Sequence, residues 1–348
     1  MRIAIVNDLA PVVEFLRRII TEVPGYEVTW VARNGVDAVK KCAADIPDLI
    51  LMDLTMPGMD GVEATRRIMA ESPCPILIVT ATVDGNTSKI FEAMGYGALD
   101  AINTPLMGNG AAEQQSREAL LKRIEAIKRL SSPSTLSAQG HARPGLPRDL
   151  PPLVVIGSST GGPKALATVL SGLPKDIRAA IIIVQHVGGE FSEGLAGWLN
   201  AQTPLNVSLA TRGRQPAGSA VFLAGSNDHL ILAPDLTLTY TKEPSNIPFR
   251  PSVDVFFKSV AEHWPSKGVA VLLTGMGRDG AEGLAALRRA GWYTIAQDEA
   301  TSVVYGMPKV ARDLGAAVDI LPIDRVAPAI VQFLTKGRPP LRVMSWEW

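Results

Sequence analysis

The sequence predicts an α/β protein made of two doubly wound domains, each built on a mainly parallel sheet. Short apolar runs of strand length alternate with amphipathic stretches of helical periodicity, and this alternation occurs twice along the 348 residues. Strands that alternate with helices predict a parallel sheet covered on both faces. A segment rich in Ser, Pro and Gly separates the two series, and the length is sufficient for two domains.

The first series starts at the beginning of the chain. Ile3–Val6 reads as a buried strand, and Pro11–Glu22 has the apolar spacing of a helix. Further strands are expected at Leu49–Asp53 and Ile76–Thr80, each followed by a polar turn and a helical pattern. The series ends with a helix near Glu113–Leu130.

The second series follows Ser131–Leu150, a segment without periodicity that is typical of a flexible linker. Its expected strands are Leu153–Ile156, Ala180–Val184, Ala220–Ala224 and Val269–Thr274. We therefore divide the chain into a first domain at residues 1–125, a helix end and linker at 126–151, and a second domain at 152–340.

Composition excludes several classes of function. With 34 basic and 34 acidic residues, the charge is balanced and does not favour a nucleic-acid partner. Cys42 and Cys74 have no metal-ligand spacing and form no disulfide framework, which fits a reducing cytoplasm. Asp8 and Glu14 interrupt any signal-peptide core, and apolar runs such as Ala179–Val184 are too short for membrane insertion.

Polar side chains gather where three strands of the first series end. Asn7 and Asp8 follow the first strand, Asp53 ends the next apolar run, and Thr80 ends the last. The carboxyl ends of parallel strands meet at one edge of a sheet. A strand-end Asp can simply cap a helix, but two carboxylates together with a backbone carbonyl suit Mg²⁺.

The run Leu51–Gly61 (LMDLTMPGMDG) resembles the phospho-acceptor loop of receiver domains, and the resemblance covers residues 1 to about 125. It implies that Asp53 accepts a phosphoryl group and that Thr80 hydrogen-bonds the phosphate. It also implies that Asp8 and Asp53 bind Mg²⁺ together with the carbonyl of Thr55.

Three positions depart from the receiver pattern. Asn7 replaces one of the two usual acidic residues, Thr104 replaces the usual Lys, and Ala101 replaces the switch aromatic. The absent Lys removes a charge-assisted contact to the phosphate of about 1.5–3 kcal/mol. We therefore expect phosphorylation at Asp53 with altered stability and coupling.

In the second series, the strand Leu153–Ile156 leads directly into Gly157–Gly162 (GSSTGG) and a helical run from Pro163. This segment matches the G-x-S-x-G pattern of serine nucleophiles, with Ser159 at its centre. The same kind of turn also binds phosphate at a helix N-terminus or simply reverses the chain. The motif alone therefore leaves these alternatives open.

The chain has four histidines from which a general base could come. His141 lies in the linker, His263 stands at an expected helix end, and His229 follows a polar turn, where a turn or surface role is favoured. His186 ends the strand Ala180–Val184 and is expected at the same sheet edge as the Gly/Ser-rich turn.

Asp279 completes a possible triad. It follows the strand Val269–Thr274 in a Gly-rich turn, although it could also cap the helix that begins at Ala281. Ser159, His186 and Asp279 stand at three strand ends, which favours a catalytic triad. Their order along the chain differs from the Ser…Asp…His order of α/β-hydrolases.

Four segments together resemble the catalytic domain of chemotaxis methylesterases of the CheB type, over residues 152 to about 335. They are Gly157–Gly162, Gln185–His186, Phe249–Asp254 (FRPSVD) and Leu273–Gly280 (LTGMGRDG). The resemblance implies that Ser159 is the nucleophile, His186 the general base and Asp279 its orienting acid. It further implies an oxyanion donor at the Met276 backbone N–H, with Thr160 beside the nucleophile.

The resemblance implies that the protein is a response regulator that demethylates glutamate methyl esters on the cytoplasmic helical bundle of chemoreceptors. Some relatives also deamidate glutamines there. A CheA-type histidine kinase would supply the phosphoryl group, and Mg²⁺ would serve the receiver alone. Val6–Asp8 and Asn103–Pro105 make the chain most similar to the methylesterases of Wsp-type surface-sensing systems.

Two functions of other classes stay open on the residues alone. A nucleotide-binding module could use Gly157–Gly162 as a phosphate loop, but the G-x-G-x-x-G and P-loop spacings are absent. The other is a docking adaptor without catalysis, and the presence of all three triad residues argues against it.

Overall fold

The computed structural model describes residues 1–81, 83–108, 110–129, 150–247 and 249–336. The expected linker at 131–149, including His141, and residues 337–340 of the second expected domain lie outside the described residues. No helix within the described ranges is long and apolar enough to cross a membrane.

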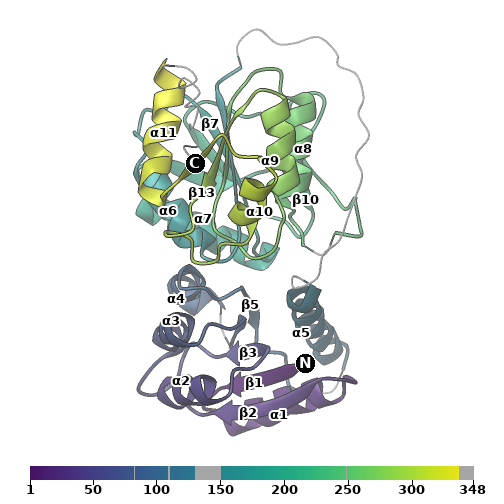
Figure 1. Cartoon of the computed structure of the whole chain (residues 1–348). Helices are drawn as coiled ribbons and strands as arrows, with labels where there is room; N and C mark the ends of the chain where they lie inside the picture. The colour runs from purple at the N-terminus through teal and green to yellow at the C-terminus, as the bar shows by residue number, and fades with distance from the viewer. Residues whose placement is uncertain (82, 109, 130–149, 248, 337–348) are drawn as a thin grey trace.

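The first domain is a parallel sheet with strand order β2-β1-β3-β4-β5 (Figure 1). Helices α1 and α5 bury their apolar side chains on one face, and α2, α3 and α4 bury theirs on the other. The strands are β1 Arg2–Val6, β2 Glu27–Ala32, β3 Leu49–Met52, β4 Ile76–Thr80 and β5 Asp100–Asn103. The helices are α1 Ala10–Thr21, α2 Gly35–Ala44, α3 Gly61–Glu71, α4 Val83–Gly95 and α5 Ala111–Arg129.

Local sequence signals fix several of these elements. The side chains of Asn34 and Asp60 accept hydrogen bonds from the first turns of α2 and α3, as N-cap residues do. Gly61 opens α3 where a Cβ would lie 2.0 Å from the carbonyl oxygen of Asp53. Only glycine lets α3 begin this close to the loop after β3.

The second domain is a seven-stranded parallel sheet with order β14-β13-β12-β6-β7-β9-β8, accompanied by an antiparallel pair, β10 and β11. Helices α6, α7 and α11 cover one face, and α8, α9 and α10 cover the other. The strands are β6 Leu153–Ser158, β7 Ala180–Gln185, β8 Asn206–Leu209, β9 Ala220–Leu223, β10 His229–Leu232, β11 Leu238–Thr241, β12 Val269–Leu272, β13 Tyr293–Gln297 and β14 Asp319–Leu321. The helices are α6 Gly162–Ser171, α7 Gly189–Gln202, α8 Val253–His263, α9 Ala281–Arg289, α10 Met307–Asp313 and α11 Ile323–Lys336.

The strand order reverses beside β6. The chain leaves β6 for β7 on one side and later returns as β12 on the other side of β6. In open α/β sheets, the crevice at such a switch point, outside the carboxyl ends of the strands, is where ligands bind. The ends of β6, β7 and β12 are therefore the expected place for a site.

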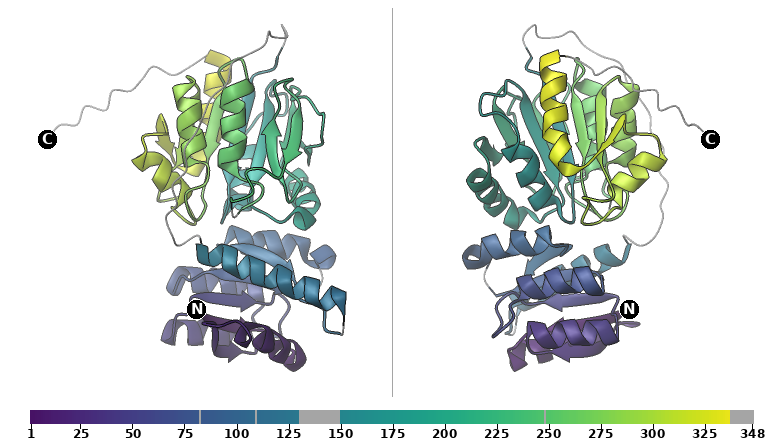
Figure 2. Two further views of the ribbon diagram at one scale, coloured as in Figure 1. Left: turned by 90° about the vertical axis from the view of Figure 1, so that its right-hand side faces the viewer. Right: turned by 60° about the vertical axis from the view of Figure 1, so that its left-hand side comes forward.

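The first domain packs against that end of the second sheet, with α4 lying on α6 and α7 (Figure 2). Phe91 on α4 is buried, and its ring centroid lies 6.1 Å from that of Trp198 on α7. Arg123 on α5 forms an ion pair with Glu190 at the start of α7, N···O 3.5 Å. One buried apolar cluster thus continues across both domains.

The predicted fold class, two doubly wound mainly parallel sheets, is confirmed. The predicted strands match β1, β3, β4, β6, β7, β9 and β12 to within a few residues. The domain boundaries at 125 and 151 stay predictions, and α5 continues across the first of them to Arg129.

Candidate active site

Ser159 stands directly after β6 on a turn held by main-chain bonds. Its N–H donates to the Thr274 carbonyl at 3.0 Å, and its own carbonyl accepts from the Gly162 N–H at 2.7 Å. Gln185 also donates to the Ser159 carbonyl at 2.9 Å. A Cβ at Gly162 would lie 1.9 Å from the Gln185 Oε1, so glycine is required there. The turn is fixed before any ligand arrives.

His186 follows β7 and connects two other predicted residues. Its Nδ1 lies 3.1 Å from Ser159 Oγ, and its Nε2 lies 2.7 Å from Asp279 Oδ2. An ionised carboxylate only accepts hydrogen bonds, so Nε2 carries the proton and Nδ1 presents a lone pair to the serine hydroxyl. The ring of Phe249 stacks on the imidazole with centroids 5.2 Å apart. This geometry allows His186 to take a proton from Ser159.

Asp279 stands in the loop between β12 and α9, and its carboxylate contacts the N-terminus of α8. Its Oδ1 accepts from the Ser252 hydroxyl at 2.8 Å, and its Oδ2 accepts from the Val253 N–H at 2.6 Å. Burial alone would raise the pKa of Asp279, but the hydrogen bonds from His186, Ser252 and Val253 outweigh it and hold the pKa below its ordinary value. The carboxylate therefore stays charged beside His186.

A second carboxyl group lies close to Asp279. The N–H of Asp254 donates to Asp279 Oδ1 at 3.1 Å, and the Asp254 Oδ1 accepts from the Gly283 N–H at 2.6 Å. Burial, followed by the negative charge of Asp279, raises the pKa of Asp254 to about 7. This pair consists of one strongly ionised and one weakly acidic carboxyl group.

Thr160 and Met276 flank the three residues. Thr160 is buried, and its carbonyl accepts from the Thr274 hydroxyl at 2.9 Å. Met276 lies in the loop after β12, and its side chain packs against the apolar cluster of the first domain. The segment that contains the expected oxyanion donor therefore also contacts the first domain.

The first domain covers this site. Ser159 and His186 are only 7% and 8% exposed. Arg123 reaches between the domains, 2.7 Å from Asp100 on β5, and its guanidinium lies over the backbone of Gly188, two residues after His186. Burial raises the pKa of Asp100, while the positive charge of Arg123 and the hydrogen bond from the Ala101 N–H oppose that rise.

Asp53 follows β3 at the carboxyl edge of the first sheet. Its Oδ2 accepts from the Asn7 Nδ2 at 3.1 Å, and the Thr55 N–H lies 3.4 Å from its Oδ1. Burial raises the pKa of Asp53, backbone hydrogen bonds oppose this, and the charge of Asp8 adds to it. Thr80 ends the adjacent strand β4 and is buried.

A cation at this edge would relieve both effects that raise the Asp53 pKa. The carboxylates of Asp8 and Asp53 and the carbonyl of Thr55 are hard oxygen donors, which fit Mg²⁺. The described residues contain no group of three or more His, Cys, Asp or Glu side chains that could hold a metal. The protein would therefore supply these oxygens to Mg²⁺, with water and a phosphate filling the other positions of its octahedron.

The three departures from the receiver pattern have visible consequences. Asn7 donates a hydrogen bond to Asp53, which a carboxylate at this position would not do. Ala101 is completely buried on β5, and the Thr104 N–H donates to the Thr80 carbonyl at 2.9 Å. The end of β5 is thus attached to β4 through its backbone.

One interpretation was wrong. The polar turn before His229 favours a turn or surface role, but this residue opens β10 and is completely buried. No pattern in the sequence indicated the roles of Gln185, Ser252 and Phe249, although Ser252 stands before an apolar helix as an N-cap residue does.

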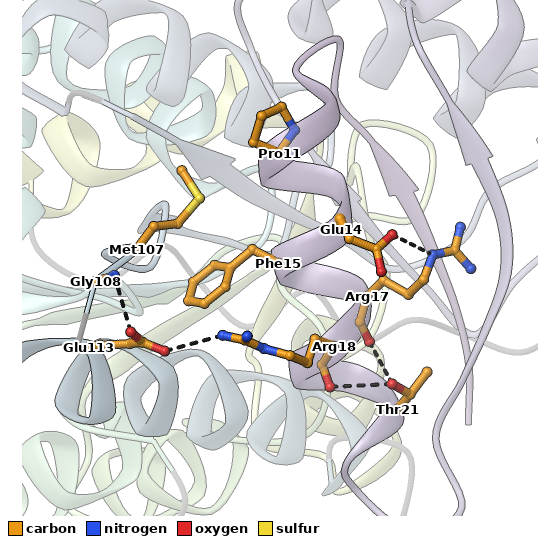
Figure 3. A pocket seen from close by; sticks show the side chains of 9 residues that line it. All are labelled: Pro11, Glu14, Phe15, Arg17, Arg18, Thr21, Met107, Gly108 and Glu113. Carbon is orange, nitrogen blue, oxygen red and sulfur yellow. Dashed lines mark hydrogen bonds and ion pairs between the residues drawn. The ribbon is translucent and has the colours of Figure 1, made fainter. Parts of the chain in front are cut away.

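A hollow on the surface of the first domain belongs to neither site. It lies on the first domain between α1 and the start of α5 (Figure 3). Phe15 and Met107 form its apolar wall, and Glu113 bonds both the Gly108 N–H and Arg18 at its end.

The fold and the two strand-edge clusters define a class: a response regulator whose receiver domain is joined to an α/β output domain with a hydrogen-bonded Ser–His–Asp group. The protein-family model described as response regulator receiver domain matches residues 3–109. The family model described as CheB methylesterase matches residues 154–330. The chain belongs to the CheB methylesterase family.

Relatives with the same domain pair cover almost the whole chain. A protein-glutamate methylesterase/protein-glutamine glutaminase of Burkholderia orbicola is 54% identical over 331 residues, covering 95% of this chain and 97% of the relative. One of Pseudomonas fluorescens is 53% identical over 339 residues, covering 97% and 100%. The crystal structure of the Thermotoga maritima CheB methylesterase catalytic domain is 36% identical, with a TM-score of 0.50, and covers 52% of this chain and 98% of that one.

Proposed function

We propose that this protein is a protein-glutamate methylesterase that removes methyl groups from glutamate esters on chemoreceptors and also deamidates receptor glutamines. The names of the relatives support this activity. The observation that carries the proposal is the hydrogen-bonded chain from Ser159 through His186 to Asp279 at the switch point of the second sheet.

In the proposed reaction, Ser159 Oγ attacks the ester carbonyl while His186 Nδ1 takes the hydroxyl proton. Asp279 stabilises the imidazolium that forms. The Met276 N–H, with Thr160 alongside, serves the oxyanion. Methanol leaves with the proton from His186, and a water activated by the same nitrogen then hydrolyses the acyl-enzyme. A glutamine would react in the same way, with ammonia as the leaving group.

The product is a carboxylate on the receptor helix surface where a neutral ester stood. Added like charge changes helix–helix repulsion in the receptor bundle and so biases its signalling state. This chemistry gives adaptation in a chemosensory pathway. It places the protein in the cytoplasm, where the receptor bundle lies.

The receiver is proposed to regulate the esterase through phosphorylation of Asp53 by a CheA-type histidine kinase. Asp8, Asp53 and the Thr55 carbonyl would hold Mg²⁺, and Thr80 would bond the phosphate. When bound, the cation neutralises charge on the transferring phosphoryl group. The coverage of Ser159 and His186 by the first domain supports a receiver that inhibits the esterase until it is phosphorylated.

The test is release of radiolabelled methanol from methylated receptor by the purified protein. Ser159→Ala and His186→Ala should each reduce kcat by about 10⁴- to 10⁶-fold, because triad members act as a unit. Ser171→Ala, on the exposed end of α6, is the matched control and should leave the rate unchanged. Near-wild-type turnover in Ser159→Ala would contradict the proposal.

Ser158 is the alternative nucleophile that this experiment should include. It is completely buried, and its hydroxyl donates to Gln185 Oε1 at 2.6 Å. That hydrogen bond fixes the Gln185 amide that holds the Ser159 turn. Ser158→Ala should therefore reduce activity far less than Ser159→Ala.

A further inference from the structure

His229 has both ring nitrogens engaged in a completely buried position. Its Nδ1 accepts a hydrogen bond from the Ser252 N–H at 3.1 Å, and its Nε2 lies 3.2 Å from the Pro244 carbonyl oxygen. A backbone N–H can only donate and a carbonyl can only accept, so the proton must be on Nε2. The two contacts thus require one neutral tautomer of His229.

The two partners are the two ends of a single loop. Between Pro244 and Ser252 this loop carries Phe249, whose ring stacks on His186. His229 therefore joins the ends of the segment that packs against the proposed general base. Arg250 adds a second tie within the loop, from its Nη2 to the Ser245 carbonyl at 2.9 Å.

Ser252 transmits this constraint to the acid of the triad. Its hydroxyl donates to Asp279 Oδ1 at 2.8 Å, and the next backbone N–H, that of Val253, donates to Asp279 Oδ2 at 2.6 Å. The same Oδ2 lies 2.7 Å from His186 Nε2. Displacement of the Ser252 backbone would move two of the donors that orient Asp279.

We propose that His229 is a positioning residue for the esterase, resting on the proposed function. By holding the Ser252 N–H, it fixes the start of α8 and keeps Asp279 aimed at His186. It touches neither substrate nor the reacting atoms. A histidine that only filled the core would affect stability without a selective effect on kcat.

Two variants separate these roles because each retains one of the two contacts. In His229→Asn, the side-chain oxygen can occupy the place of Nδ1 and accept from Ser252, but nothing reaches Pro244. In His229→Gln, the longer amide can donate to Pro244, but the acceptor for Ser252 is lost. Each variant therefore loses one hydrogen bond, so their thermal midpoints should be similar.

The full-length unphosphorylated protein is assayed for demethylation with each variant. His229→Gln should lose about 10- to 100-fold in kcat with little change in KM, because sub-ångström misplacement of a catalytic group has this kind of cost. His229→Asn should keep a kcat within a few-fold of wild type. Equal kcat in the two variants, whether near wild type or equally reduced, overturns the proposal.

A measurement on the wild-type protein covers the case in which the variants do not fold. Long-range ¹H–¹⁵N NMR distinguishes the imidazole tautomers, and His229 should give the signature of a neutral ring protonated at Nε2 near pH 7. An Nδ1-protonated or charged ring would overturn the proposal. The tautomer measurement does not depend on turnover. Its failure can therefore be told apart from a failure of the proposed function, which would appear as unreduced demethylation in Ser159→Ala.

Discussion

The N–H of Gly161, two residues after Ser159, donates a hydrogen bond to the carbonyl of Met94 in the last turn of α4, with an N···O distance of 3.0 Å. Gly161 has a φ of +77°, so this turn conformation strongly favours glycine. The receiver thus satisfies a backbone donor on the turn that carries the proposed nucleophile. In the proposed inhibition, this contact opens before a receptor helix reaches Ser159.

Weakening the interface should activate the unphosphorylated protein. Arg123 joins Asp100 of its own domain, at 2.7 Å, to Glu190 of the other, at 3.5 Å. Arg123→Ala removes this bridge and should raise basal methanol release about 2- to 5-fold, since a partly exposed ion pair contributes up to about 1 kcal/mol. Arg117→Ala is the control, because Arg117 lies on the same helix but pairs with Glu22, away from the interface. Equal rates for wild type and Arg123→Ala would show that this bridge does not hold the domains together.

Removal of the negative charge of Asp279 should lower kcat. Asp279 accepts hydrogen bonds from His186, Ser252, Val253 and Asp254, so all four of these neighbours are donors. In Asp279→Asn, the amide NH₂ would face one of these donors, and the imidazolium would lose its counter-charge. We expect kcat to fall about 10²- to 10⁴-fold, less than for Ser159→Ala. Asp235→Asn, in the turn between β10 and β11, is the control and should have the wild-type kcat. A similar kcat in Asp279→Asn and Asp235→Asn would argue against the acid role of Asp279.

The sequence predicted most of the fold because both sheets are parallel. Strands buried on both faces are continuous apolar runs, as in β3 and β7, and the alternation with helices then gives the layers. The antiparallel pair β10–β11 was not predicted, since β10 begins with His229 and β11 is only partly apolar. Short strands whose burial depends on distant packing leave little periodicity to detect.

The site was predictable to the extent that it stands on strand ends. Ser159 and His186 follow β6 and β7 directly, and topology alone brings them to one edge. The role of His229 depends instead on where the Pro244–Ser252 loop folds back. The periodicity of apolar residues does not predict the conformation of a loop. The contact between Gly161 and Met94 lies between domains, so no local pattern could indicate it.

The raised pKa of Asp254 makes the free energy of unfolding depend on pH. Its pKa in the folded protein is about 7, above its ordinary value of 3.8. Between these values the unfolded chain binds fewer protons than the folded one, so this group lowers the free energy of unfolding as pH rises. Above pH 7 the penalty is complete and constant. Asp254→Asn removes it while keeping an oxygen for the Gly283 N–H.

The stability of Asp254→Asn relative to wild type should therefore increase from pH 5 to pH 7 and then level off. Urea denaturation at intervals of half a pH unit from pH 5 to pH 8 measures this. Asp235→Asn serves again as the control, because hydrogen bonds from Thr237 lower the pKa of Asp235 and no such rise is expected in this range. A pH-independent difference between Asp254→Asn and wild type would mean that Asp254 is ionised throughout the range.

The last prediction concerns the groups that the receiver lacks. Asn7 donates to Asp53 at 3.1 Å, and Thr104 offers only a hydroxyl where other receivers place an ammonium. Asp8, Mg²⁺ and Thr80 must then carry more of the phosphate stabilisation, so Asp53 should accept a phosphoryl group from the cognate kinase but poorly from small phosphodonors. In Asn7→Asp a second carboxylate would face Asp53, which strengthens Mg²⁺ binding, and Thr104→Lys would supply the missing positive charge.

Phosphate incorporation is compared in wild type, Asp53→Ala and the double variant Asn7→Asp/Thr104→Lys, with methylesterase activity measured on the same samples. The double variant should take up phosphate from small donors faster and hold it longer. Its esterase activation should rise less than its phosphorylation, because the buried Ala101 has no aromatic ring to move toward the interface. If Asp53→Ala leaves both phosphate incorporation and activation unchanged, the receiver is a docking domain, and the contact between Met94 and Gly161 is a fixed joint between the domains.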